Sequence, residues 1–385
     1  MIRTQLRKFV APEYIFGEGA RLLAGQYARN LGARKVLVVT DPGVMAAGWS
    51  KEITDSLDKE NIPHTTFSDI MPNPRDNEVM AGAEHYRKEG CNAIVVVGGG
   101  SPIDCAKGIG IVSSNRGHIL SFKGVDMVTS PMPPLICIPT TAGTSADVSQ
   151  FAIINDIGNR NKIAIISKAV VPDASLIDPV TLLTMDPYLT ACTGMDALVH
   201  AIEAFVSNAN SPMSDIHALE AMKILSKNLL ASLKSPNDIS LRGQVMFGSL
   251  QAGLAFSNAS LGGVHAAAHS LGGFLDLPHG ECNAILLQHV MDFNFEMAKD
   301  RYLKIGEALN LDMRGMVTKE KKAAILGEIR RLKLATGIES RLREKGVRIT
   351  DIPSLAAKAI HDPCILTNPR KANRRDIEVI YEESL

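Results

Sequence analysis

The sequence lacks a cysteine pattern that could build a disulfide framework or a thiolate zinc site. Its six cysteines are scattered over 385 residues, and no two of them form a CxxC pair. Disulfide-rich domains and cysteine zinc sites depend on closely and regularly spaced cysteines. Both classes are therefore disfavoured, and we expect a protein of a reducing compartment, the cytoplasm.

The chain also lacks an excess of charge of either sign. Its 41 Lys and Arg residues balance 41 Asp and Glu residues, which gives a formal net charge of zero. Proteins that bind nucleic acid or anionic membranes attract these partners with positive charge. One Trp and six Tyr residues also provide few stacking surfaces for single-stranded nucleic acid. We expect no nucleic acid among its partners.

Long apolar runs are missing as well. No stretch approaches the roughly 18 apolar residues needed to cross a bilayer. Residues 1–8 lead into polar turn chemistry rather than into the apolar core of a secretory signal. We expect neither a signal peptide nor a membrane partner.

The first half of the chain alternates strand-like and helix-like segments. Apolar, β-branched runs at residues 34–41, 93–97 and 135–138 are typical of strands buried on both faces of a parallel sheet. Helical patterns lie between them, which predicts a doubly wound α/β domain. Residues 153–154 and 162–166, separated by a turn-rich stretch, predict an appended hairpin.

The second half is dominated by segments of helical period. A chain of 385 residues exceeds one compact core. We therefore expect two domains, an α/β dinucleotide-binding domain at 1–185 and an all-helical domain at 186–385.

A glycine-rich loop, Gly98-Gly99-Gly100-Ser101, follows a predicted strand and precedes a predicted helix. Glycines there let a phosphate approach the backbone, and the helix N-terminus offers unpaired N–H groups. A plain helix start explains the same residues, because Ser101 is a good N-cap, Pro102 suits the first helical position and Asp104 resembles a capping-box acid. The loop is not a GxGxxG motif, so both interpretations stay open.

Two further strand ends point to the same edge of the sheet. Thr140, Thr141 and Thr144 follow a strand and offer hydroxyl donors for a pyrophosphate or ribose. Ligands of open α/β sheets collect at the carboxyl ends of the strands. Asp41 ends the first strand, where a carboxylate accepts a ribose 2′-hydroxyl and repels a 2′-phosphate. This favours NAD over NADP, although Asp-Pro-Gly is also an ordinary turn.

The histidines suggest a metal site. Asp196 and His200 are spaced i, i+4, which places both side chains on one face of a helix. His265 and His269 repeat this spacing in H-A-A-A-H, and His279 lies in a Pro-His-Gly turn. There is no HExxH motif, so the glutamate base of a zinc protease is missing. A carboxylate with several imidazoles favours a divalent cation, and Fe²⁺ and Zn²⁺ suit it equally.

Taken together, these motifs resemble the iron-containing (group III) alcohol dehydrogenase family over essentially the whole chain. The motifs that carry the resemblance are F-G-E-G from Phe16, G-G-G-S-P-I-D-C-A-K from Gly98, P-T-T-A-G-T from Pro139, G-M-D-A-L-V-H-A-I-E from Gly194, V-H-A-A-A-H-S-L-G-G-F from Val264, P-H-G from Pro278 and T-N-P-R from Thr367. The resemblance implies a nucleotide-binding α/β domain, a helical domain, an active site between them, the fold shared with dehydroquinate synthase, and a homodimer or larger homo-oligomer.

The resemblance also implies roles for single residues. The metal ligands are Asp196, His200, His265 and His279. His269 is a nearby catalytic histidine that does not bind the metal and serves proton relay or nicotinamide contact. The NAD-binding residues are Asp41, Gly98, Gly99, Gly100, Ser101, Asp104, Thr140, Thr141, Thr144 and Lys162. The substrate pocket is lined by Phe151, Phe256, Leu261 and Cys364.

The sequence departs from the family pattern at one place. The family usually reads G-T-G-S-E-V-T where this chain reads Gly143-Thr144-Ser145-Ala146-Asp147-Val148-Ser149. Ser145 replaces a flexible glycine near the expected cofactor phosphates, and Asp147 is one methylene shorter than the usual acid. We expect an effect on cofactor affinity or a different duty, with activity retained.

These patterns predict an NAD-dependent and metal-dependent oxidoreductase that interconverts a small primary alcohol or diol and its aldehyde. The alternatives are a polyol dehydrogenase of the glycerol or 1,3-propanediol type and a regulatory relative without catalysis. A metal hydrolase is disfavoured, because no general base stands beside the histidines.

Overall fold

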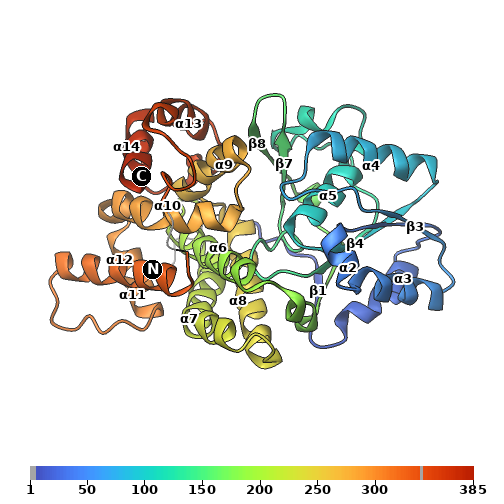
Figure 1. Cartoon of the computed structure of the whole chain (residues 1–385), viewed down its shortest axis with the longest axis horizontal. Helices are drawn as coiled ribbons and strands as arrows, with labels where there is room; N and C mark the ends of the chain where they lie inside the picture. Colours follow the sequence, from blue (N-terminus) through green and yellow to red (C-terminus); the bar gives the residue numbers. More distant parts are fainter. Residues whose placement is uncertain (1–5, 339–340) are drawn as a thin grey trace.

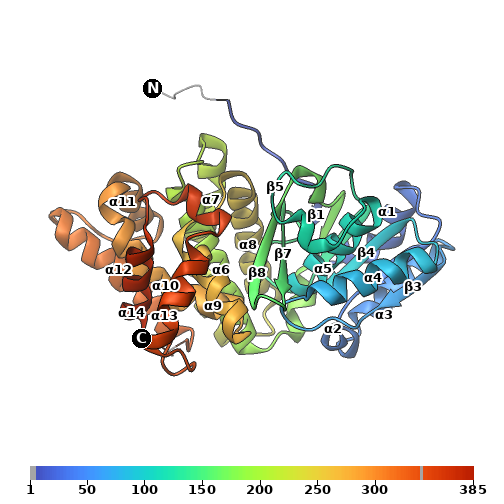
Figure 2. The same cartoon turned by 90° about the horizontal axis from the view of Figure 1, so that it is seen from above.

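The computed structural model describes residues 6–338 and 341–385. Two halves lie side by side, an α/β half and a helical half (Figures 1 and 2). The predicted fold class is confirmed, and the predicted border at 185/186 falls directly before the first long helix of the second half.

A parallel six-stranded sheet forms the centre of the α/β half, with the strand order β1-β9-β6-β4-β2-β3. Its strands are β1 (Glu13–Phe16), β2 (Val36–Val39), β3 (His64–Phe67), β4 (Ala93–Gly98), β6 (Leu135–Pro139) and β9 (Ala174–Ile177). The β-branched strands β2, β4 and β6 are fully buried, because alternate side chains face two separate apolar clusters.

Helices cover both faces of this sheet (Figure 1). They are α1 (Ala24–Asn30), α2 (Pro42–Ala46), α3 (Trp49–Lys59), α4 (Asp76–Lys88) and α5 (Gly100–Ser114). The chain runs from β2 to β3 on one side and then to β4 on the other side of β2. The ends of β2 and β4 therefore flank a topological switch point, where α/β sheets bind their ligands.

The predicted hairpin is confirmed and joins a second, smaller sheet. Strands β7 (Phe151–Asp156) and β8 (Asn161–Ile166) pair antiparallel, and β5 (Gly124–Val125) adds to β8. The hairpin lies against the helical half, where Gly273 of α9 packs on the backbone of Asn161.

The helical half begins with α6 (Pro187–Val206), and its described residues contain no strand. The further helices are α7 (Pro212–Lys234), α8 (Ile239–Ala259), α9 (Gly263–Leu275), α10 (His279–Asn294), α11 (Lys299–Ala308), α12 (Thr318–Ala335), α13 (Ile352–Ala359) and α14 (Arg374–Ser384). Short 3₁₀ helices connect the elements of both halves: Ala20–Leu23, Ile119–Phe122, Lys168–Val170, Pro179–Thr184, Phe295–Met297, Ile349–Asp351 and Pro363–Thr367.

Helix α6 is the central helix of this half. Seventeen consecutive residues, from Thr190 to Val206, are buried. Of the described helices, α6 alone is long and apolar enough to cross a membrane by length and composition, and 94% of its most apolar window is buried inside the protein. A core helix has these properties too. Because α6 is held on all sides, polar residues on it have fixed positions.

The first described residues contact the helical half, not the sheet. The Phe9 ring stacks on His217 of α7 at 5.4 Å, and the Val10 backbone N–H donates to Asn258 Oδ1 of α8 at 2.7 Å. The chain therefore packs against the second half before it enters the first.

Candidate functional site

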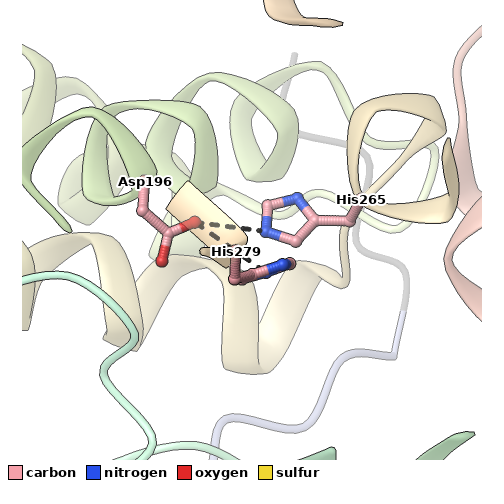
Figure 3. A group of neighbouring side chains, drawn as sticks. All are labelled: Asp196, His265 and His279. Atoms are coloured by element: carbon pink, nitrogen blue, oxygen red, sulfur yellow. Dashed lines mark ion pairs between the residues drawn. The ribbon is translucent and has the colours of Figure 1, made fainter. Parts of the chain in front are cut away.

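Three helices bring four predicted metal ligands together. Asp196 Oδ1 lies 3.9 Å from Nε2 of His200, 3.8 Å from Nε2 of His265 and 3.9 Å from Nε2 of His279. Figure 3 shows Asp196, His265 and His279 facing one another. Asp196, His200 and His265 are buried, and the His279 side chain is 22% exposed. Three imidazole nitrogens therefore lie around one carboxylate oxygen, in surroundings that exclude most solvent.

Local structure fixes these positions. Asp196 and His200 lie one turn apart on α6, and His279 is the first residue of α10 after Pro278. The next residue, Gly280, permits α10 to touch α6. A Cβ atom there would lie 2.2 Å from the carbonyl oxygen of Cys192. The glycine of the Pro-His-Gly turn is therefore required for His279 to reach Asp196.

Hydrogen bonds orient two of the imidazoles. Nδ1 of His200 lies 3.2 Å from the carbonyl oxygen of Gly143, and Nδ1 of His265 lies 2.6 Å from Glu203 Oε2. Both oxygens accept hydrogen bonds, so Nδ1 carries the proton and Nε2 keeps its lone pair. Burial, and secondly His200, lowers the pKa of His265 well below its usual value. Burial, and secondly Lys162, does the same for the pKa of His279. Neutral imidazole is the form that binds metals.

The polar atoms around this cluster fit a divalent cation. Among the described residues, Asp196 Oδ2, His279 Nδ1 and Asn283 Oδ1 are buried without a hydrogen-bond partner. The Asn283 amide nitrogen lies 2.6 Å from Asp196 Oδ1, 3.1 Å from His265 Nε2 and 3.2 Å from His279 Nε2. One amide nitrogen has only two hydrogens for these three acceptors, so it leaves at least one of them unsatisfied. A cation would satisfy the carboxylate and the imidazole lone pairs together. Three nitrogens and one carboxylate suit Fe²⁺ and Zn²⁺ alike.

His269 lies beside the cluster and points its Nδ1 elsewhere. Its ring stacks on His279 at a centroid distance of 5.3 Å. Its Nδ1 lies 2.9 Å from Asp362 Oδ2, and both residues are buried. Burial opposes ionisation of Asp362, but the His269 ring and hydrogen bonds from Cys364 outweigh it and lower the pKa of Asp362. The pair is thus a buried carboxylate–imidazole dyad next to the predicted metal ligands.

A cavity of about 210 Å³ opens on the other side of this dyad. Asp362 lines it together with Ser270 of α9, Lys162 of β8 and Lys358 of α13. The carboxylate therefore stands between His269 and a polar space.

The predicted cofactor loops lie together at the switch point of the sheet. Gly98 pairs with Pro139 at the ends of β4 and β6. A Cβ atom on Gly99 would lie 3.0 Å from Thr141 Cγ2, and one on Gly100 would lie 2.7 Å from Thr144 Cγ2. The glycine loop and the threonine loop are in contact and leave no room for side chains on the glycines. Thr140 continues the threonine loop directly after β6.

The helix start at this loop corrects one expectation. Ser101 is not the N-cap of α5, because the helix begins at Gly100 and Gly99 holds the cap position without a side-chain hydrogen bond. The Ser101 hydroxyl instead accepts the Asn73 backbone N–H at 3.1 Å, and Pro102 follows Ser101 inside the helix. The capping interpretation of this motif is therefore wrong. The N–H groups at the start of α5 lack a side-chain partner within the described chain, which suits an anionic ligand.

Asp41 caps its own helix at the end of β2. Its Oδ1 accepts the Val44 backbone N–H of α2 at 2.9 Å. This contact belongs to the ordinary Asp-Pro-Gly turn that was the alternative to ribose binding. It uses one of the two carboxylate oxygens. The other carboxylate oxygen lies at the carboxyl end of β2, beside the switch point.

Lys162 and Asp104 lie between the cofactor loops and the histidines. Lys162 Nζ donates to Asn73 Oδ1 at 2.7 Å, and a Cβ atom on Gly272 of α9 would lie 3.2 Å from this Nζ. Burial raises the pKa of Asp104 to about 7 against the opposing charges of Lys107, Lys162 and, more weakly, His269. The two predicted cofactor residues therefore face the seam between the halves.

The structure places three of the four predicted pocket residues beside the histidines or the dyad. The Phe256 ring stacks on His200 at 4.3 Å, and Phe151 meets Phe256 edge-on at 5.5 Å. Cys364 donates its backbone N–H to Asp362 at 2.8 Å. Leu261 is buried and lies just before α9.

The departure from the family pattern is accommodated locally. Ser145 adopts a positive φ of 48°, a conformation that glycine adopts freely. Its hydroxyl donates to the carbonyl oxygen of Ser249 in α8 at 2.8 Å. Asp147 is buried, and its Oδ2 accepts the Ser175 hydroxyl at 2.6 Å. These bonds tie the threonine loop to α8 and β9, and the predicted metal ligands are untouched.

Four residues that contact the predicted site were not predicted from the sequence. Glu203 stands three residues after His200 and Asn283 four residues after His279, so helical spacing alone could have suggested them. Asp362 and Gly143 meet their histidines from distant parts of the chain. No local pattern signals such contacts.

Comparisons with known proteins agree with this architecture. Residues 11–179 match the family model "Iron-containing alcohol dehydrogenase", and residues 190–385 match "Fe-containing alcohol dehydrogenase family, C-terminal". The chain is 38% identical to a 1,3-propanediol dehydrogenase of Citrobacter freundii, over 96% of each chain. It is 35% identical to an NAD-dependent methanol dehydrogenase of Bacillus methanolicus, over 98% of this chain and 99% of the other.

A solved structure of a 1,3-propanediol oxidoreductase superposes with a TM-score of 0.95 at 36% identity, covering 99% of this chain and 100% of the other. The likeness thus extends over both halves and the seam between them.

Proposed function

This chain belongs to the iron-containing alcohol dehydrogenase family and is an oxidoreductase of alcohols and aldehydes, and we propose that it uses NAD and a divalent cation, Fe²⁺ or Zn²⁺, on a small primary alcohol or diol. The observation that carries the proposal is that the Nε2 atoms of three imidazoles each lie within 4 Å of one carboxylate oxygen, Asp196 Oδ1. A cation held there would supply Lewis-acid polarisation of the substrate oxygen, and a nicotinamide bound between the two halves would accept the hydride.

The cofactor choice is supported by the strand ends. The tight contact between the glycine and threonine loops and the uncapped start of α5 suit a pyrophosphate. The Asp41 carboxylate at the end of β2 favours an unphosphorylated ribose, so we propose NAD rather than NADP.

The substrate class is supported by the side chains around the histidines. Phe151, Phe256, Leu261 and Cys364 are buried and apolar and offer no charge to anchor a carboxylate or phosphate. Phe256 covers one face of the His200 ring and excludes water from it. A small neutral alcohol or diol fits such surroundings, and the methanol and 1,3-propanediol relatives support this size class.

His269 and Asp362 are proposed to move the proton that alcohol oxidation releases. Asp362 holds the Nδ1 proton of His269, which leaves Nε2 free to accept a proton from the hydroxyl or from an intervening water. Asp362 also borders the polar cavity, so the proton can leave the dyad on the side that faces away from the histidine cluster.

A polyol dehydrogenase is the second candidate, and the 38% identity to a 1,3-propanediol dehydrogenase favours it. A regulatory relative without catalysis is disfavoured, because all four metal ligands are kept. We further propose a cytoplasmic homodimer or larger homo-oligomer.

An anaerobic assay tests the proposal. Protein freed of metal is loaded with Fe²⁺ or Zn²⁺ and offered NAD or NADP with methanol, ethanol, 1-propanol, 1,3-propanediol and glycerol. We expect metal-dependent NADH formation with the short alcohols or diols, and loss of metal and turnover together in His265→Ala. Turnover by metal-free His265→Ala would contradict the scheme, and a preference for glycerol would select the second candidate.

A further inference from the structure

A buried glutamate links helix α6, which carries Asp196 and His200, to the N-terminus of α9. Glu203 lies one turn after His200 and two turns after Asp196, and it is 3% exposed. Its Oε1 accepts the Val264 backbone N–H at 2.7 Å, and its Oε2 lies 3.4 Å from the His265 backbone N–H. The same Oε2 lies 2.6 Å from His265 Nδ1.

These contacts define where the His265 ring can be. The two backbone bonds fix the carboxylate at the start of α9, where the helix dipole favours negative charge. The short contact to Nδ1 then fixes both the rotation of the ring and the position of its proton, because a carboxylate that receives two N–H groups acts as an acceptor. His265 Nε2 is left with its lone pair turned toward Asp196.

The other two histidines of the cluster are held differently. His200 Nδ1 contacts a carbonyl oxygen, that of Gly143, and His279 Nδ1 has no hydrogen-bond partner in the described structure. Among the three, His265 is therefore the one whose Nδ1 meets a carboxylate, the arrangement that makes an imidazole most basic toward a cation.

We propose that Glu203 is a positioning residue of the metal site, which holds His265 in the tautomer that binds a divalent cation and thereby strengthens cation binding. This inference rests on the metal site of the proposed function. Glu203 does not itself touch the position where the donor atoms converge.

The substitution Glu203→Gln isolates this role. The variant keeps the size of the side chain, but its amide must satisfy two backbone donors and one imidazole with a single oxygen. If its NH₂ group faces Nδ1, the ring takes the other tautomer and turns an N–H toward Asp196. If its oxygen faces Nδ1, the NH₂ group meets the backbone N–H of Val264. Loss of such an outer partner lowers metal affinity about 10-fold to 100-fold.

Asn368→Ala is the matched control. Asn368 Oδ1 accepts the Gly263 backbone N–H at 3.0 Å, so it caps the same helix end without contacting a predicted ligand. Loss of the Asn368 side chain weakens the start of α9 but does not change the contact that fixes the His265 tautomer.

The experiment is a titration of full-length metal-free protein with Co²⁺ in competition with a chelator, together with urea unfolding of each metal-free protein. We expect Co²⁺ affinity to fall about 10-fold to 100-fold in Glu203→Gln and to stay within about 2-fold of wild type in Asn368→Ala, although both unfold more easily. Equal affinity of Glu203→Gln and wild type overturns the inference. An equal loss in both variants also overturns it, because placement of α9 would then be the cause. Absence of Co²⁺ binding by wild type would instead overturn the metal site of the proposed function.

A second measurement does not depend on a folded variant. Nitrogen-15 shifts of the histidine rings in metal-free wild type report which nitrogen is protonated. We expect the His265 resonance to show Nδ1–H, and a ring protonated at Nε2 would overturn the inference.

Discussion

The substitution Gly280→Ala tests whether α10 must touch α6 for the site to form. Gly280 follows His279 directly, and a Cβ atom there would lie 2.2 Å from the carbonyl oxygen of Cys192 and 3.2 Å from Asp196 Cβ. The first of these atoms belongs to the backbone of a buried helix, so no side chain can rotate to make room.

The size of the effect follows from this overlap. An ordinary contact begins at about 3.4 Å, so the two helices must separate by about 1 Å at this point. Forcing an added methyl group into packed surroundings costs about 1–3 kcal/mol. The same displacement carries His279 away from Asp196, and a misplacement of about 1 Å costs about 100-fold in turnover.

Metal affinity, alcohol oxidation and urea unfolding are measured on Gly280→Ala and on Gly327→Ala. Gly327 is exposed in the middle of α12 with nothing near its Cβ position. The control variant should therefore gain about 0.5–1 kcal/mol of stability and keep full activity, because alanine favours the helix. Gly280→Ala should lose stability, metal and turnover together.

Retention of wild-type metal affinity and turnover by Gly280→Ala would refute the reasoning. It would mean that the close approach of α10 to α6 is not what positions His279.

Three further predictions concern the cofactor, the substrate pocket and the dyad. Asp41→Ala should reduce the preference for NAD over NADP, measured as the ratio of kcat/KM values, by at least about 10-fold, or about 1.4 kcal/mol. It should also lower the free energy of unfolding by about 1 kcal/mol, because the helix cap is lost. An unchanged cofactor ratio would count against the ribose contact. Phe256→Ala should lower the free energy of unfolding by about 3–5 kcal/mol, because it removes a buried ring. It should raise kcat/KM for branched alcohols relative to methanol, because the removed ring is the one stacked on His200. An unchanged substrate profile would show that Phe256 does not line the substrate pocket. Asp362→Asn should cost about 1.5–3 kcal/mol at pH 7. Because the folded pKa of Asp362 is lowered, this stability exists above its unfolded pKa of about 4 and disappears as the pH falls through the folded value. Urea unfolding from pH 7 down to pH 4 and below should therefore show the two proteins converging, and a constant gap would refute an ionised Asp362 carboxylate.

The pattern of apolar residues predicted most of the fold, because burial determines which positions of a strand or helix must be apolar. Strands that are covered on both faces must be apolar throughout, and the apolar runs that form β2, β4 and β6 have this composition. The edge strand β1 and its neighbour β9 were not predicted. Each is only four residues long, and β1 alternates little between exposed and buried side chains. Such a strand depends on its neighbour in the sheet, which a local pattern does not contain.

Helical spacing predicted which ligands share a face, because i and i+4 residues always do. It could not predict that α6, α9 and α10 meet, since their contacts join residues far apart in the chain, such as Glu203 and His265. The expected cap at Ser101 was wrong for a related reason. The Ser101 hydroxyl accepts the backbone N–H of Asn73, 28 residues away, and the helix begins at Gly100, two residues before the expected start.

The most direct measurement of the central claim is anomalous diffraction from crystals of the protein loaded with Fe²⁺ under anaerobic conditions. We predict a single iron peak per chain between the Asp196 carboxylate and the Nε2 atoms of His200, His265 and His279. An iron peak elsewhere, or none at these four side chains in protein that oxidises alcohols, would contradict it.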